Sequence, residues 1–203
     1  MNALLDKQLL GAVSIALAIV ASWPYIHSTL RGETRPHLCS WMTWAIVTTV
    51  VFFAQLQSKG GIGAWPTGVS ALLTSWVALL AWRKRGDVTV SRMDWVFLLA
   101  ALSSLPLWCF MADPLWAVVV LTVVDLLGFG PTLRKAYRQP QSEPALFYAL
   151  LALRNLTATL ALEQQSLTTL LFPAVLGVTC LIILGLLLWR RSTLAPAQFE
   201  AFQ

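Results

Sequence analysis

Two residues of opposite charge stand in stretches of this chain that are otherwise almost entirely apolar. Asp125 lies in the apolar run 114–135, and Arg154 lies in the run 144–162. Asp125 is ten residues from Lys135 and Arg154 is ten residues from Pro144. If both runs are helical, each charge is therefore about 15 Å from the same boundary. We expect these two side chains to lie at one depth and to be able to pair.

These residue types offer two kinds of chemistry. A carboxylate in a poorly hydrated cavity exchanges protons or meets a cation, depending on desolvation and on neighbouring charge. A guanidinium binds a carboxylate or phosphate through paired donors. Asn155 adds an amide beside Arg154, and Trp44 lies deep in the run 38–57. We therefore assign Arg154, Asn155, Asp125 and Trp44 to a candidate substrate site, with Asp125 also the candidate for proton coupling.

The composition places these runs in a membrane. Hydrophobic residues make up 58% of the 203 residues and charged residues 11%, with a mean hydropathy of +0.71. A soluble domain of this size could not bury so much apolar surface, so lipid must cover it.

Because the first run has Asp6 beside Lys7, we expect it to be retained and not removed as a signal peptide. Since a span needs about 20 apolar residues, we predict seven transmembrane helices, at 8–30, 38–57, 63–82, 94–112, 114–135, 144–162 and 167–189.

An internal repeat organises the predicted helices. Two prolines, a tryptophan and two basic residues recur in the same order and at one constant separation: Pro24, Pro66, Trp82, Arg83 and Lys84 match Pro131, Pro173, Trp189, Arg190 and Arg191. We call this separation, from Pro24 to Pro131, the repeat interval. Spans one to three then match spans five to seven, and the fourth is an unmatched connector. The prediction is an all-α membrane protein with two parallel three-helix repeats joined by a connector helix, a 3+1+3 arrangement. Its parts are 1–86 for the first repeat, 87–112 for the connector, 113–191 for the second repeat and 192–203 for a cytoplasmic tail.

The repeat also bears on the two buried charges. The positions one repeat interval before Asp125 and Arg154 are Ala18 and Val47. One interpretation is a structural ion pair that joins two helices. The other, which we favour, is a functional site, because the first half packs without these charges. In both halves a proline falls in the inner third of the first span, and we assign Pro24 and Pro131 as hinges.

The distribution of Lys and Arg predicts the orientation. Eleven of these residues fall on the face that holds the odd-numbered loops and the C-terminus, and only Lys7 and Lys59 fall on the other. By the positive-inside rule, the N-terminus is outside and the C-terminus cytoplasmic, in the cell (inner) membrane. Because this topology accounts for the excess of basic over acidic residues, we expect no nucleic-acid partner. The partners expected are a small-molecule solute and the lipid bilayer, and a homo-oligomer is compatible with the sequence.

The pattern of three spans, a connector and three spans, with a proline near the inner end of each first span, resembles the SWEET and PQ-loop (MtN3-like) transporter superfamily. That superfamily also includes the KDEL-receptor fold. The resemblance covers residues 8–191, although the Pro-Gln dipeptide is replaced by Pro24-Tyr25 and Pro131-Thr132. It implies two three-helix bundles with a substrate site between them. Asp125 is similar in placement to the acidic residue of proton-coupled PQ-loop amino-acid exporters.

Two functions follow as hypotheses. The first is a transporter of a small polar or zwitterionic solute that works by alternating access, with or without proton coupling. The alternative is a ligand-binding membrane receptor or scaffold of the same fold that transports nothing. We expect no enzyme, because no nucleophile stands beside a plausible base and no phosphate-binding glycine loop is present. The residue spacing predicts no metal site and no cofactor, and the three separate cysteines are assigned no chemistry.

Overall fold

The computed structural model describes residues 2–84, 91–111 and 113–200. All regular secondary structure in these residues is helical. The α-helices are α1 (Asn2–Arg31), α2 (Leu38–Gln57), α3 (Trp65–Arg83), α4 (Arg92–Met111), α5 (Pro114–Gly128), α6 (Gly130–Arg138), α7 (Ala145–Ala161) and α8 (Leu167–Glu200). Two short 3₁₀ helices, η1 (Gly61–Ala64) and η2 (Pro140–Ser142), complete the described part.

The helices identify a multi-pass membrane protein. Six segments are long and apolar enough to cross a membrane: Leu4–Arg31, Leu38–Gln57, Gly61–Arg83, Arg92–Met111, Pro114–Arg138 and Leu167–Thr193. The seventh apolar helix, α7, has 17 residues and carries Arg154. Large apolar side chains such as those of Leu72, Phe110 and Leu146 are exposed on the outside of the bundle. Such side chains are expected where lipid, and not water, surrounds the helices.

All seven predicted spans are helical, but the first and the last are longer than predicted and the fifth is divided. α1 begins at Asn2 and α8 continues to Glu200, so both are longer than predicted. The span predicted at 114–135 is divided, because α5 ends at Gly128 and α6 begins at Gly130. Pro131 follows directly in the first turn of α6, where the missing proline N–H is tolerated. The glycines and the proline explain why the hydrogen-bond ladder breaks at this point.

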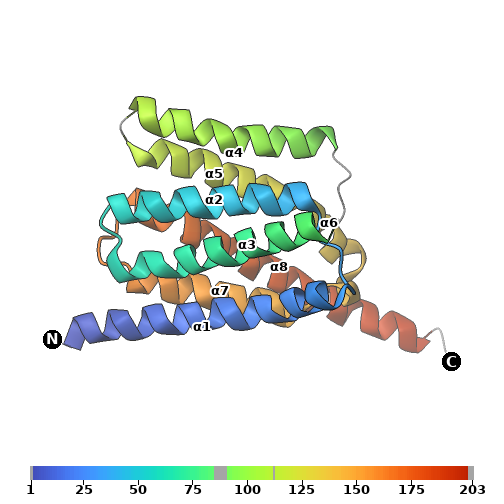
Figure 1. The fold of residues 1–203 in the computed structure, drawn as a ribbon. Helices are drawn as coiled ribbons and strands as arrows, with labels where there is room; N and C mark the ends of the chain where they lie inside the picture. The colour runs from blue at the N-terminus through green and yellow to red at the C-terminus, as the bar shows by residue number, and fades with distance from the viewer. Residues whose placement is uncertain (1, 85–90, 112, 201–203) are drawn as a thin grey trace.

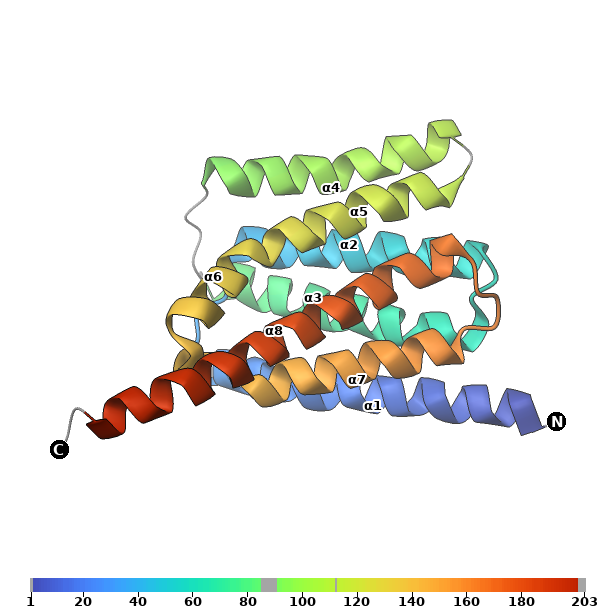
Figure 2. The same cartoon turned by 180° about the vertical axis from the view of Figure 1, so that it is seen from behind.

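Helix neighbours in space differ from neighbours in sequence. α3 packs against both α1 and α2, and α8 packs against both α5 and α7. α1 also packs against α7, and α2 against α5, while α4 contacts α2 and α5. Figures 1 and 2 show α4 along one edge of the bundle and α1 along the opposite edge. Residues far apart in sequence therefore meet along the α1–α7 and α2–α5 contacts.

The two ends of the bundle are built differently. One end, called the η1 end, holds the start of α1, the η1 turn and the loop 162–166. The other, called the α6 end, holds α6, the loop 32–37 and the last part of α8, and Figure 2 shows it on the side of the C-terminus. An apolar core joins α2, α4, α5 and α8 around Val47, Val51, Leu121 and Phe172. This packing leaves a cavity between the halves of the chain.

Candidate functional site

A central cavity of about 610 Å³ lies among α1, α2, α3, α5, α6, α7 and α8. Ser70, Thr48 and Phe172 line its deep part. Arg35, which is exposed, and His37 line it where it reaches the α6 end. The cavity therefore begins in the middle of the bundle and opens toward one end. All four residues predicted for the substrate site, Arg154, Asn155, Asp125 and Trp44, line this cavity.

Arg154 is held in place by uncharged partners. Its guanidinium donates from Nη1 to Asn155 Oδ1 at 2.7 Å. Nη2 donates to Pro66 O and to Ser70 Oγ, both at 2.7 Å. The residue is only 4% exposed, and its Nε has no hydrogen-bond partner among the described residues. A buried guanidinium is thus fixed against α3, and no carboxylate among the described residues forms an ion pair with it.

Asp125 reaches the same cavity from α5 and is 6% exposed. Its Oδ2 is buried and has no hydrogen-bond partner in the part of the chain that the structure describes. The ion pairs found among those residues do not join Asp125 to Arg154. The expected direct pair is therefore absent, because α8 lies between α5 and α7. The two charges share one cavity and do not neutralise each other by contact.

Asn155 and Trp44 contribute an amide and an aromatic wall. Asn155 accepts from Arg154 and donates from Nδ2 to Leu151 O at 2.9 Å, so its side chain is fixed at both ends. The Trp44 ring packs edge-on against Trp41, with centroids 5.1 Å apart. Trp41 in turn packs against Tyr25 and donates from Nε1 to the Tyr25 hydroxyl at 3.2 Å. These three rings form a continuous aromatic wall, here called the α1–α2 aromatic wall.

The two halves contribute matched positions to the cavity. Eight of the pairs separated by the repeat interval have both members in the lining: Ala18 with Asp125, Ser22 with Phe129, Tyr25 with Thr132, Ser40 with Phe147, Trp41 with Tyr148, Trp44 with Leu151, Thr48 with Asn155, and Leu73 with Cys180. The repeat thus extends from the sequence to the wall of the cavity. The chemistry of the two halves differs, because the position that matches Asp125 in the first half is Ala18, a buried alanine.

The two predicted hinge prolines occupy different settings. α1 runs without a break through Pro24. Pro131 lies in the first turn of α6, directly after the break between α5 and α6. The backbone interruption is therefore confined to the second of the two positions. A hinge role for either proline stays a prediction.

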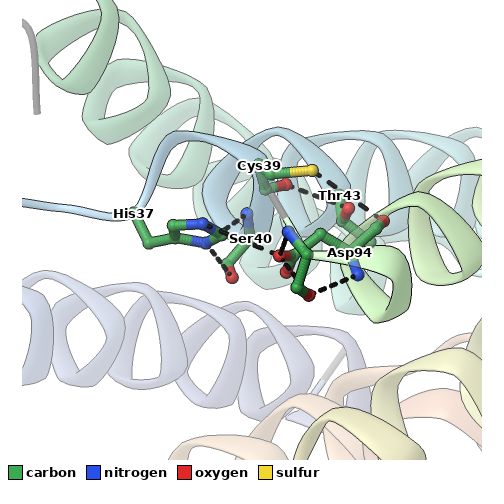
Figure 3. A network of polar contacts seen from close by, with 6 residues as sticks. His37, Cys39, Ser40, Thr43 and Asp94 are labelled. Carbon is green, nitrogen blue, oxygen red and sulfur yellow. Dashed lines mark hydrogen bonds and ion pairs between the residues drawn. The ribbon is translucent and has the colours of Figure 1, made fainter. Parts of the chain in front are cut away.

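A second cavity of about 270 Å³ adjoins the first on the side of α4. Asp125 and Trp44 line both cavities, and Asp94 of α4 lines the second. Asp94 accepts hydrogen bonds from the backbone N–H and the hydroxyl of Ser91, at 2.7 and 2.6 Å, which fixes the start of α4. Figure 3 shows Asp94 facing His37 and Ser40 at the start of α2, and His37 Nε2 is 3.9 Å from Asp94 Oδ2. This polar network attaches α4 to α2 beside the opening of the main cavity.

The η1 end is closed by hydrogen bonds between the two halves of the chain. Lys7 Nζ donates to Leu162 O at 2.8 Å and to Glu163 O at 3.3 Å. The backbone N–H of Glu163 donates to Gly60 O at 3.0 Å, and the N–H of Ile62 donates to Glu163 Oε1 at 3.2 Å. Deeper in the bundle, Gln55 Nε2 donates to Thr169 O at 2.9 Å. These bonds seal the end of the bundle that lies opposite the opening.

Gly63 makes this closure possible. A Cβ atom at Gly63 would stand 2.3 Å from Leu162 N and 2.4 Å from Leu162 Cα. Both are backbone atoms, which no side-chain rotation can move away. The η1 turn and the end of α7 therefore touch backbone to backbone, which only glycine permits here.

Sequence reasoning did not assign several residues of this site. Ser70 and the Pro66 carbonyl hold Arg154, and Tyr25 and Cys180 line the cavity. The repeat is the signal that could have found two of them, since Tyr25 matches Thr132 and Cys180 matches Leu73, and all four line the cavity. No comparable signal links Arg154 to Ser70, because these residues are 84 positions apart in different halves.

The site shows no gathering of metal ligands: among the residues described, no group of three or more His, Cys, Asp or Glu side chains could hold a metal ion. Compared with known proteins, the chain matches no family model, no curated protein and no solved structure.

Proposed function

We propose that this chain is a membrane transporter that moves a small solute through the central cavity by alternating access. The observation that carries the proposal is the difference between the two ends of the bundle. The cavity containing Asp125 and Arg154 opens at the α6 end, while hydrogen bonds between the halves close the η1 end. A carrier needs a buried site that is open to one side at a time.

The helix contacts support a 3+1+3 arrangement for this transporter. In the proposed first unit, α3 packs between α1 and α2; in the second, α8 packs between the α5–α6 segment and α7. The contacts between units also correspond, because exchanging the units turns the α1–α7 contact into the α5–α2 contact. Together with the eight matched pairs in the lining, this is the pattern expected of parallel repeats around one axis. α4 is the connector.

In this proposal Asp125 is the proton or cation partner, and Arg154 and Asn155 contact the solute. The N-terminus lies outside the cell membrane and the C-terminus in the cytoplasm, as the eleven-to-two distribution of basic residues predicts. The η1 end is then the outer end, and the structure corresponds to an inward-open state. Pro24 and Pro131 are placed to let the first helix of each unit bend during the transition.

The test is a crosslink that holds the η1 end closed. A Cβ on Gly11 would stand 4.0 Å from the Cβ of Ala161, which is within the range that a disulfide spans. It would also stand 2.9 Å from Ile62 Cγ2, so the Ile62 side chain must shift to admit the cysteine. The doubly substituted protein Gly11→Cys/Ala161→Cys is reconstituted in liposomes loaded with a mixture of the standard amino acids, and efflux is followed by mass spectrometry. We expect efflux from the reduced protein, loss on oxidation and recovery on reduction.

The single variants Gly11→Cys and Ala161→Cys are the matched controls, since oxidation should leave their efflux unchanged. Efflux that continues in the fully crosslinked protein would contradict alternating access. Binding of an amino acid without any efflux would instead favour the receptor.

A further inference from the structure

The deep part of the cavity holds one negative and one positive charge that do not touch. Asp125 and Arg154 both line it, and no ion pair joins them among the described residues. The hydrogen-bond acceptors of Arg154 are an amide, a backbone carbonyl and a hydroxyl, all uncharged. Since an unpaired charge is strongly disfavoured away from water, the ionised form of each group favours a ligand group of the opposite sign.

Both charged groups also keep unused hydrogen-bonding capacity. A guanidinium has five N–H donors, and hydrogen bonds to the protein use three of those of Arg154. Its Nε–H is without a partner among the residues described. Asp125 Oδ2 is likewise an acceptor without a partner there. Both atoms are themselves buried, so a ligand reaches them only when the side chains shift within the cavity that they line. An anionic group would then satisfy Arg154, and an ammonium group would satisfy Asp125.

The walls between these charges are mainly apolar and aromatic. The α1–α2 aromatic wall, consisting of Tyr25, Trp41 and Trp44, faces a cavity that Phe147 and Tyr148 also line. A volume of about 610 Å³ is typical of sites for drug-sized ligands. A minimal zwitterion such as glycine would leave most of this space and all of the aromatic wall without contact.

We propose that the cavity binds an amphipathic zwitterion with a flat aromatic body. Its cationic group binds Asp125, its anionic group binds Arg154, and its aromatic body packs on the α1–α2 aromatic wall. A cation alone would leave Arg154 unbalanced, and an anion alone would leave Asp125 unbalanced. This inference names the solute class for the proposed transporter and rests on that proposal only through the shared cavity.

A panel of four related probes tests each element of the inference. L-Tryptophan has both charges and an aromatic body, tryptamine lacks the carboxylate, indole-3-propionate lacks the ammonium group, and glycine lacks the aromatic body. Binding to the purified protein is measured by isothermal titration calorimetry at neutral pH. We expect L-tryptophan to bind about tenfold or more tightly than tryptamine and indole-3-propionate, the difference expected when one charge-assisted hydrogen bond is lost. It should also bind more tightly than glycine, which buries no aromatic surface.

Two variants assign the charges to the residues. Asp125→Asn should reduce the affinity for L-tryptophan to that for indole-3-propionate and leave the affinity for indole-3-propionate nearly unchanged. Arg154→Gln should likewise reduce the affinity for L-tryptophan to that for tryptamine and leave the affinity for tryptamine nearly unchanged. Arg83→Gln is the matched control: it removes a positive charge at an exposed residue outside the cavity lining, and should preserve the order of the four probes. Thermal unfolding of each variant verifies that it is folded.

Equal affinities across the panel, or no binding by L-tryptophan, would overturn the inference. So would a loss of tryptophan binding in Asp125→Asn that is matched by an equal loss for indole-3-propionate. Binding in the expected order without flux would refute transport and leave this inference standing. Flux of other solutes, with no preference for L-tryptophan, would support transport and refute this inference.

Discussion

The closed η1 end leads to a quantitative prediction at Gly63. In Gly63→Ala the added Cβ would stand 2.3 Å from Leu162 N, whereas ordinary contacts of a Cβ begin near 3.4 Å. The η1 turn must therefore move away from the end of α7 by about 1 Å. Alanine is otherwise the better helix former, so a destabilisation of the closed state can only come from this contact.

The hydrogen bonds across the closure determine the size of the effect. A displacement of this size weakens the bonds from Glu163 N to Gly60 O, from Ile62 N to Glu163 Oε1 and from Lys7 Nζ to Leu162 O. Each such bond contributes about 0.5–1.5 kcal/mol net. Loss of two gives about 2 kcal/mol, which raises the ratio of open to closed η1 ends about 30-fold.

Thiol labelling measures this ratio. The three native cysteines are replaced by alanine, and Thr48→Cys places a single thiol on the cavity wall. A charged, membrane-impermeant maleimide is added from the side of the η1 end, in vesicles of known orientation. We expect Gly63→Ala to accelerate labelling of that thiol about 30-fold.

Gly185→Ala is the matched control, because a Cβ at Gly185 meets nothing within 4 Å. It should label at the rate of the parent. Equal rates for the two glycine variants, with both proteins folded, would refute the conclusion that Gly63 keeps the η1 end closed.

Three further predictions concern coupling, stability and orientation. Asp125→Asn should abolish the pH dependence of flux in proteoliposomes if the carboxylate carries the proton; an unchanged pH profile would remove that role. Arg191→Gln should lower stability by roughly 1–3 kcal/mol, because Arg191 makes three hydrogen bonds to Pro140 O and Glu143 O. A thermal shift no larger than that of Arg83→Gln, at an exposed basic residue, would contradict this. A fluorescent protein fused to the C-terminus should fluoresce in the cytoplasm. Labelling of that end from outside the cell would contradict the predicted orientation.

Several features of the molecule follow from local patterns in the chain. The length of each apolar run predicted its helix, since a run of about 20 apolar residues both favours a helix and needs lipid. The depth of Asp125 and Arg154 could be counted from the ends of their runs, and both residues do line the cavity. The repeat interval predicted that the halves correspond, and eight pairs in the lining have that separation.

The interaction partners of Asp125 and Arg154 could not be predicted from their positions along the chain. Hydropathy and spacing describe one helix at a time, whereas the neighbours of a helix depend on how side chains of different helices interlock. The sequence therefore suggested a direct pair between Asp125 and Arg154, but α8 lies between their helices. Arg154 is bound instead by Ser70 and by the Pro66 carbonyl of α3.

By itself the amino-acid sequence determined that the chain is helical, crosses a membrane several times and carries two opposite charges within apolar runs. Apolar length, turn residues and charge act locally, so they can be read along the chain. Only the tertiary structure decided that the charges stay apart, that aromatic rings of α1 and α2 form one wall of the cavity and that Gly63 allows one end to close. These features depend on backbone and side-chain contacts between residues far apart in sequence, and such contacts exist only once the helices have packed.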